Sequence, residues 1–133
     1  MIAQKRTKQR LSIADNSQYL RIGSKHKGAY FKKSLIIYIE ACESYSWIHL
    51  IDGSKVLSSK TIGYYEELFS NENFTRIHRS YLINPLHLKR YEPRYRLVHL
   101  YGEHVLSVSH RKNRLIAKMA QNQELSTPFR MAV

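Results

Sequence analysis

The sequence predicts a mainly β domain with two short helices. Its apolar residues fall mostly in short runs rich in β-branched and aromatic side chains, a composition typical of strands. Glycine-containing dipeptides separate several of these runs, and only two segments show helical spacing. The run at 35–39, LIIYI, is too short for a convincing helix, so we expect a buried strand there.

Two hairpins are predicted, because a dipeptide that reaches positive φ easily suits a tight turn between two strands. The paired runs and their turns are 47–51 and 55–58 around Asp52-Gly53, and 96–101 and 104–108 around Gly102-Glu103. Two other segments have helical periodicity. They are Ile62, Tyr65, Leu68 and Phe69 after a Thr61 cap, and Leu115, Ile116 and Met119 near the end.

Length and composition narrow the class of protein. A chain of 133 residues allows one core of ordinary size, so we expect a single folded domain over 18–122 with a C-terminal tail over 123–133. The run at 35–39 is much shorter than the roughly 20 apolar residues of a membrane helix, so no membrane association is expected. The single cysteine, Cys42, cannot form an internal disulfide, which favours a reducing, cytoplasmic compartment.

Charge is strongly basic and unevenly distributed. The net charge of +12 predicts a polyanionic partner, and nucleic acid is favoured over anionic lipid or acidic protein. Residues 1–17 are expected to form a basic arm, because four Lys or Arg and no acid fall within 1–12. Residues 40–75 carry a net charge of −4, whereas 76–114 carry +7 and five of the seven histidines.

The stretch FTRIHRSYLINP at 74–85 places three hydrogen-bond donors inside an apolar segment. Strand alternation puts Ile77 and Arg79 on one face and Arg76, His78 and Ser80 on the other, and we expect the polar groups to emerge at the rim of a sheet. Because the fork of an arginine matches the O6 and N7 acceptors of guanine, the apolar residues would anchor the segment while its guanidinium groups face DNA.

Several stretches together carry a family resemblance: IIYIEA at 36–41, IHLIDG at 48–53, YYEELF at 64–69, FTRIHRSYLIN at 74–84 and VSHR at 108–111. With these residues the chain resembles the LytTR DNA-binding domain of bacterial transcription regulators over about 20–120. The segment at 74–84 is the most specific of the five. The resemblance implies an elongated fold of antiparallel β-sheets that docks loops, rather than a recognition helix, into successive major grooves of DNA.

The resemblance also implies where bases are contacted. Three places match: Ser44 and Tyr45 in the loop after the Glu-Ala strand, Arg79, and the position after Ser109. At that last position the family commonly has arginine and this chain has His110, with Arg111 next to it as a substitute. The predicted base contacts are therefore Tyr45, Arg79, His110 and Arg111. The predicted phosphate contacts are Lys25, Lys27, Lys55, His78, Lys89, Arg90, Arg94, Lys112 and Arg114.

Some of these residues have structural alternatives. Arg79 could be a solvated arginine at the sheet rim, Arg76 an ion-pair partner of Glu66, Glu67 or Glu72, and His78 a packing residue. Asn84-Pro85 is expected to form only a turn in which the asparagine caps the backbone. Other expectations concern the interior, where we place Cys42 and the tyrosines Tyr38, Tyr64, Tyr65 and Tyr81.

The sequence therefore predicts a regulator that binds double-stranded DNA, with no enzymatic activity, metal or cofactor. A second copy on an adjacent half-site and an unidentified upstream signalling partner are possible partners. Two other classes stay open: a histidine-based nuclease, since seven histidines could supply acid and base, and an RNA-binding module, since tyrosines stack on unpaired bases. Neither HExxH nor zinc-finger spacing is present, and no RRM or KH signature is visible.

Overall fold

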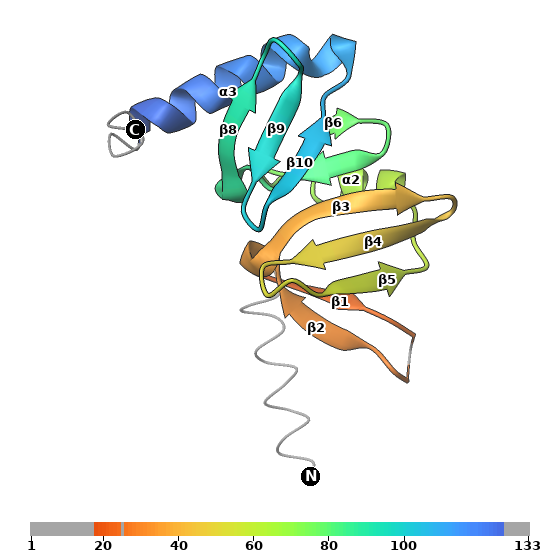
Figure 1. Ribbon diagram of the computed structural model, residues 1–133. Coiled ribbons are helices and arrows are strands. Elements are labelled where there is room, and N and C mark those ends of the chain that lie inside the picture. The colour runs from red at the N-terminus through yellow and green to blue at the C-terminus, as the bar shows by residue number, and fades with distance from the viewer. Residues whose placement is uncertain (1–17, 25, 127–133) are drawn as a thin grey trace.

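The computed structural model describes residues 18–24 and 26–126, and the side chains up to residue 121. The predicted arm at 1–17, Lys25 and residues 127–133 of the predicted tail lie outside the described residues. Three antiparallel sheets and two α-helices make up the described part, which confirms the mainly β fold (Figure 1).

The largest sheet has five strands in the order β5-β4-β3-β7-β6. Their bounds are β3 (Ile36–Cys42), β4 (Tyr45–Leu50), β5 (Lys55–Ser58), β6 (Thr75–His78) and β7 (Tyr81–Ile83). The central strand β3 begins with four successive buried residues, Ile36 to Ile39, because both faces of the sheet are covered there. The turn at Asp52-Gly53 joins β4 to β5 as predicted, and Gly53 has φ +92°.

Two smaller sheets flank the five-stranded sheet. One has the order β10-β9-β8, with β8 (Leu88–Glu92), β9 (Leu97–Leu100) and β10 (His104–Ser107), and it contains the second predicted hairpin. The other is a hairpin of β1 (Tyr19–Ile22) and β2 (Ala29–Lys32), which the sequence did not predict. Short 3₁₀ turns connect the sheets, η2 (Lys33–Leu35) and η3 (Pro85–His87), and a third, η4 (His110–Lys112), joins β10 to the second α-helix.

Both predicted helices are present. In α2 (Ile62–Leu68), the side chain of Thr61 accepts a hydrogen bond from the amide of Tyr64, so the predicted N-cap is confirmed. The second helix, α3 (Asn113–Ser126), continues past the predicted stripe at 115–119 through the polar run at 121–124. It packs beside β8, as Figure 1 shows.

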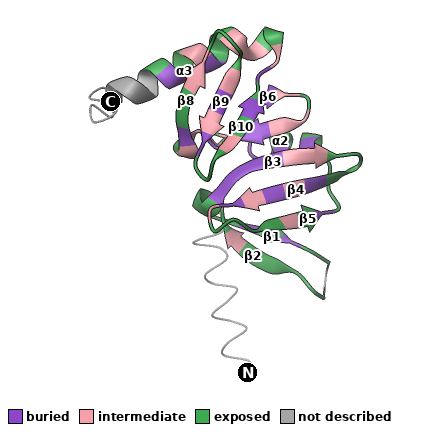
Figure 2. Cartoon of the chain, in the orientation of Figure 1, coloured by how far each residue is buried: buried purple, intermediate pink, exposed green. Residues whose placement is uncertain are grey.

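The core divides into two clusters, one on each face of the five-stranded sheet. Figure 2 shows which parts of the strands and helices are buried. On one face, Ile37, Ile77 and Ile83 pack with residues of β9, β10 and α3. On the other face, Ile36, Ile39 and Ile48 pack with α2 and the β1–β2 hairpin. Ile37 and Tyr38 therefore point into one core and Ile36 and Ile39 into the other, because a register irregularity between Ile36 and Tyr38 interrupts the alternation of β3.

Two expectations about the interior are wrong. Tyr64 is 44% exposed, because α2 buries Ile62 and Tyr65 and turns the neighbouring Tyr64 outward. Cys42 is also exposed, because it is the last residue of β3 and lies beyond the part of the strand that the core covers. Tyr38 and Tyr65 are buried, as expected, and Tyr81 is half-buried.

Histidine rings line the contact between the large sheet and the β9–β10 hairpin. The ring of His49 stacks on Tyr38 with centroids 4.1 Å apart, and the ring of His104 lies 5.4 Å from that of His49. The His49 Nε2 atom lies 2.9 Å from Glu40 Oε1. Burial lowers the pKa of His49 below 6.5, against the opposing effect of the Glu40 hydrogen bond, and the nearby His104 and Lys55 also lower it.

A pH dependence of stability follows from this depressed pKa. The unfolded chain binds the His49 proton more readily than the native state, so the native state is favoured above about pH 6.5 and loses that advantage as the pH falls through the lower native pKa. We expect the free energy of unfolding, measured by denaturant titration, to fall between pH 7 and 5, and His49→Gln to flatten part of that fall. A His49→Gln profile parallel to that of the wild type would contradict the assignment.

Candidate nucleic-acid interface

Three loops lie together at one edge of the molecule, the right-hand edge in Figure 1. Strand pairing brings the β3–β4 turn and the β6–β7 turn to the same end of the sheet, because Glu40 pairs with Tyr81 and the amide of Ala41 donates to Ser80 O at 2.9 Å. The amide of Ser109 donates to Ile77 O at 2.8 Å, which places the start of η4 beside β6. The three places that the sequence singled out are therefore neighbours.

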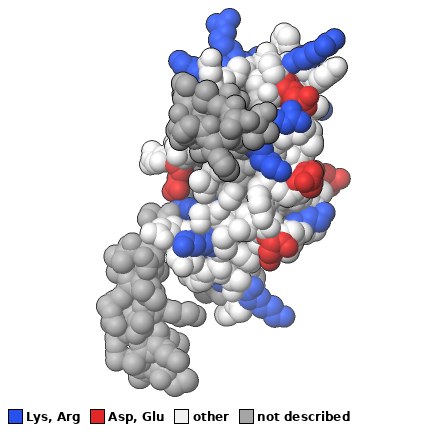
Figure 3. Space-filling model, turned by 60° about the vertical axis from the view of Figure 1, so that its left-hand side comes forward, with Lys and Arg blue, Asp and Glu red and all other residues white. Residues whose placement is uncertain are grey.

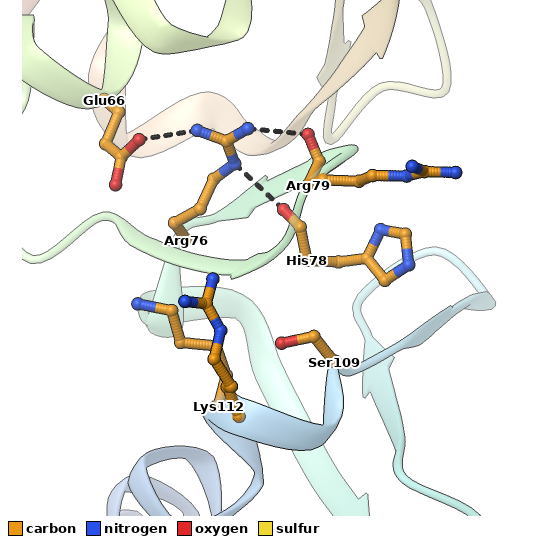
Figure 4. A pocket seen from close by; sticks show the side chains of 7 residues that line it. Glu66, Arg76, His78, Arg79, Ser109 and Lys112 are labelled. Carbon is orange, nitrogen blue, oxygen red and sulfur yellow. Dashed lines mark hydrogen bonds and ion pairs between the residues drawn. The ribbon is translucent and has the colours of Figure 1, made fainter.

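The Arg76 side chain bonds to the backbone of the β6–β7 turn and fixes its conformation (Figure 4). Its Nε donates to His78 O at 2.9 Å and its Nη2 to Arg79 O at 2.6 Å, while Nη1 pairs with Glu66 Oε1 at 2.5 Å. One planar guanidinium thus links two successive carbonyl groups of the turn to α2. The predicted ion-pair role of Arg76 is confirmed, with Glu66 as its partner.

Arg79 lies at the rim, but not where strand alternation placed it. The strand β6 ends at His78 after an irregularity between Arg76 and His78, so Arg79 belongs to the turn and does not share the buried face of Ile77. Its side chain is exposed and extends away from Arg76 in Figure 4. The Arg79 guanidinium makes no hydrogen bond or ion pair with a described residue, which leaves its donors available to a ligand.

His78 combines packing with an available donor. Its Nδ1 accepts a hydrogen bond from the amide of Ser80 at 3.1 Å, and its ring centroid lies 5.3 Å from that of Tyr81. With Nδ1 as an acceptor, the neutral ring carries its proton on Nε2. The imidazole is half-buried and lines the same hollow as Arg79.

A hollow of about 440 Å³ separates the β6–β7 turn from η4. Its lining residues are Glu66, Arg76, His78, Arg79, Ser109, Arg111 and Lys112. Since Arg76 and Glu66 neutralise each other, the charges that face the hollow without a described partner are those of Arg79, Arg111 and Lys112. Three cations around one hollow favour an anionic or acceptor-rich ligand.

The two candidates next to Ser109 differ in placement. Arg111 lines the hollow with Arg79, whereas His110 is exposed and does not line it. Both belong to η4, whose 3₁₀ geometry sends successive side chains in different directions. Tyr45 is 48% exposed at the first position of β4, directly after the turn in which Glu43 has φ 56°. It therefore belongs to the same edge but to a separate loop.

The predicted phosphate contacts fall into two groups. Lys112 lines the hollow, Arg114 is exposed in the first turn of α3, and Arg94 lies in the β8–β9 turn. That turn is held near η4 because the amide of Val108 donates to Arg96 O at 2.8 Å. Arg96 is exposed with φ 53° and was missed as a candidate, although its place beside Arg94 in a basic segment could have indicated it.

The remaining phosphate candidates lie elsewhere. Lys55 stands at the far end of β4 from Tyr45, with its Nζ 4.4 Å from the Trp47 ring centroid. Lys89 and Arg90 lie on β8, and Lys27 lies between β1 and β2. On the face seen in Figure 3, basic side chains are dispersed with acidic ones between them. A phosphate role for these four residues stays a prediction.

Two structural observations concern other functions. Within 18–24 and 26–126, no set of three or more His, Cys, Asp or Glu side chains is arranged to hold a metal ion. Over the same described part of the chain, no helix has the length and apolar character needed to cross a membrane.

The three-sheet fold has counterparts among known proteins. A family model described as the LytTr DNA-binding domain matches residues 27–121, and the chain belongs to this family. A solved LytTr DNA-binding domain from Bacillus cereus has a similar fold, with a TM-score of 0.65 and 18% sequence identity over 77% of this chain and 95% of that one. No curated protein matches the chain.

Proposed function

We propose that the protein is a bacterial transcription regulator that binds duplex DNA sequence-specifically, with Arg79 and Arg111 as its main base contacts. The observation that carries this proposal is the pair of exposed guanidinium groups that line one hollow, with the turn of Arg79 braced by Arg76. A guanidinium fixed at its base can present two donors to the O6 and N7 atoms of guanine.

The dimensions of the loop edge suit a major groove. Adjacent strands are about 4.8 Å apart, so the turn at 79–80 and its neighbour η4 fit within the roughly 12 Å width of one groove. Tyr45 lies on β4, which is two strands away from β7 in the sheet. At the same spacing this distance is about 10 Å, so Tyr45 can contact the next part of the duplex. We propose phosphate contacts for Lys112, which lines the hollow, and for Arg114 and Arg94 in α3 and the β8–β9 turn.

The alternatives have less support from the same hollow. An RNA-binding module would need aromatic faces for unpaired bases, and the lining contains no Tyr, Phe or Trp. A histidine-based nuclease would need an acid and a base within reach of one scissile bond, and His78 is the one histidine in the lining. Sequence-specific duplex binding is therefore the better proposal. The similar Bacillus cereus domain is itself described as part of a DNA response regulator.

Selection of bound sites from random duplex DNA tests this function. We expect one enriched motif, and two copies of it about one helical turn apart if two molecules occupy one face of the duplex. On the enriched site, about five to eight neutralised phosphates should give a slope of roughly −5 to −7 for log K against log salt. Absence of an enriched motif, or a slope near −1, would contradict the proposal.

A further inference from the structure

The β1–β2 hairpin presents one polar face to solvent and one apolar face to the core. Leu20 and Ile22 are buried against the five-stranded sheet. On the opposite face, the register pairs Tyr19 with Lys32 and Arg21 with Tyr30, and all four residues are exposed. Strand alternation therefore gathers two tyrosines and two cations on one surface.

Hydrogen bonds fix the described residues on both sides of Lys25, between β1 and β2. The Arg21 guanidinium donates to Gly23 O at 3.3 Å and to Ser24 O at 2.5 Å, and the Lys27 amide donates to Ser24 Oγ at 3.0 Å. Gly23 has φ +120°, and a Cβ there would come within 2.8 Å of Lys27 O, so the backbone at this point requires glycine. Lys27 is thus exposed on a backbone of defined geometry.

Charge on this hairpin is of one sign. Residues 16–39 contain five Lys or Arg and no Asp or Glu. Lys33 pairs with Glu72, but neither Lys27 nor Lys32 forms an ion pair with a described residue. We define the hairpin surface as Tyr19, Lys27, Tyr30 and Lys32. Exposed lysines and tyrosine hydroxyls on a paired hairpin are suited to phosphate oxygens, which both side-chain types contact in protein–DNA complexes.

The β1–β2 hairpin points to the side of the molecule on which we place the DNA. In Figure 1 the end of the hairpin that joins β1 to β2 points to the same side of the molecule as the β3–β4 turn. The hairpin packs on the α2 face of the large sheet, one layer away, and layers are about 10 Å apart. If the hairpin is also offset from the β3–β4 turn by up to two strand spacings, the two elements are about 10 to 20 Å apart. This distance corresponds to about 3 to 6 base pairs of duplex.

We propose that the hairpin surface binds the phosphate backbone of the duplex flanking the sequence-specific site, and so extends the footprint on one side. This inference rests on the proposed function, because it uses the direction of DNA set by the three loops. The contact carries no base specificity, since lysine and tyrosine donors on phosphate position a protein without distinguishing bases. Its effect is to fix the orientation of the protein on its site and to raise the affinity for long duplexes.

The test compares wild type with Lys27→Ala/Lys32→Ala on two duplexes. Both carry the motif enriched in the selection, one with about 10 base pairs on each side and one trimmed to the motif. We expect trimming to weaken the wild type and to leave the variant unchanged. On the long duplex the slope of log K against log salt should be less steep for the variant, by about 2. The hydroxyl-radical footprint of the variant should also be shorter at one end. Both lysines are exposed, so thermal unfolding should be unchanged.

A matched control separates this contact from general charge. Lys118→Ala removes one charge from an exposed position on α3 that is not among the predicted phosphate contacts, and it should keep the wild-type dependence on duplex length. An unshortened footprint in the hairpin variant, or an equal loss of length dependence in the control, would overturn the proposal. A loss of affinity in the hairpin variant that is seen with single-stranded RNA and not with duplex DNA would also overturn it. If the wild type enriches no motif at all, the proposed function itself fails.

Discussion

Arg79→Ala is expected to weaken binding to the specific site by about 1 to 3 kcal/mol, roughly 5- to 150-fold, and binding to random duplex DNA much less. The physical reason is that Arg79 is exposed at the hollow and makes no bond to a described residue, so its removal costs the complex but not the fold. Fluorescence anisotropy on matched specific and random duplexes measures both losses. The thermal unfolding midpoint should stay at the wild-type value.

The two residues of η4 supply comparisons for this variant. Arg111→Ala should behave like Arg79→Ala, because both guanidinium groups line the hollow. His110→Ala serves as the control, since His110 is exposed in the same 3₁₀ turn and does not line the hollow. Equal losses on specific and random DNA would reassign Arg79 to a phosphate contact. A larger effect of His110→Ala than of Arg111→Ala would move the third base contact to His110.

Arg76→Ala is expected to lower both stability and affinity. The variant removes three bonds of a charged donor group, to His78 O, Arg79 O and Glu66, and bonds of this kind contribute about 1.5 to 3 kcal/mol to the free energy of unfolding. Specific DNA binding should weaken as well, because the turn that carries Arg79 loses its brace. Denaturant titration and anisotropy on the same preparation measure the two effects.

Two substitutions distinguish the bonds of Arg76 to the turn backbone from its ion pair with Glu66. Glu66→Gln removes only the charge of a half-exposed partner, so it should cost about 0 to 1 kcal/mol of stability and little affinity. Arg76→Lys keeps the charge but lacks the planar fork that reaches both carbonyls, so it should resemble Arg76→Ala. A loss of affinity in Arg76→Ala with unchanged stability would show that Arg76 contacts DNA directly.

Asn84 illustrates how a local sequence signal can be correct and incomplete. As predicted, its side chain caps the backbone after the strand, because Oδ1 accepts from the amide of Leu86 at 3.1 Å. The residue is also buried, and its Nδ2 donates to Ile36 O at 2.9 Å. That second bond spans 48 positions of the chain, and no local pattern specifies which distant carbonyl a buried amide will meet.

The sequence by itself determined β3, the two hairpins around Asp52-Gly53 and Gly102-Glu103, both helices and the family, but not the β1–β2 hairpin or β8. These features depend on alternation, spacing and glycine positions within a few residues, and the stretch at 74–84 carries the family resemblance in residue type and spacing. Alternation failed at Arg79, however, because β6 ends one residue earlier and the irregularity between Arg76 and His78 shifts the register.

Only the tertiary structure decided which of the candidate residues act together. Long-range contacts, the Ser109 amide on Ile77 O and the Ala41 amide on Ser80 O, bring three loops that are distant in sequence to one edge. Because of the same packing, Arg111 lines the hollow and His110 does not. Arg76 bonds to the backbone of the β6–β7 turn, and Lys55 lies at the other end of its sheet. Composition fixes how many cations the chain carries, but their arrangement around a ligand depends on contacts between residues far apart in the chain.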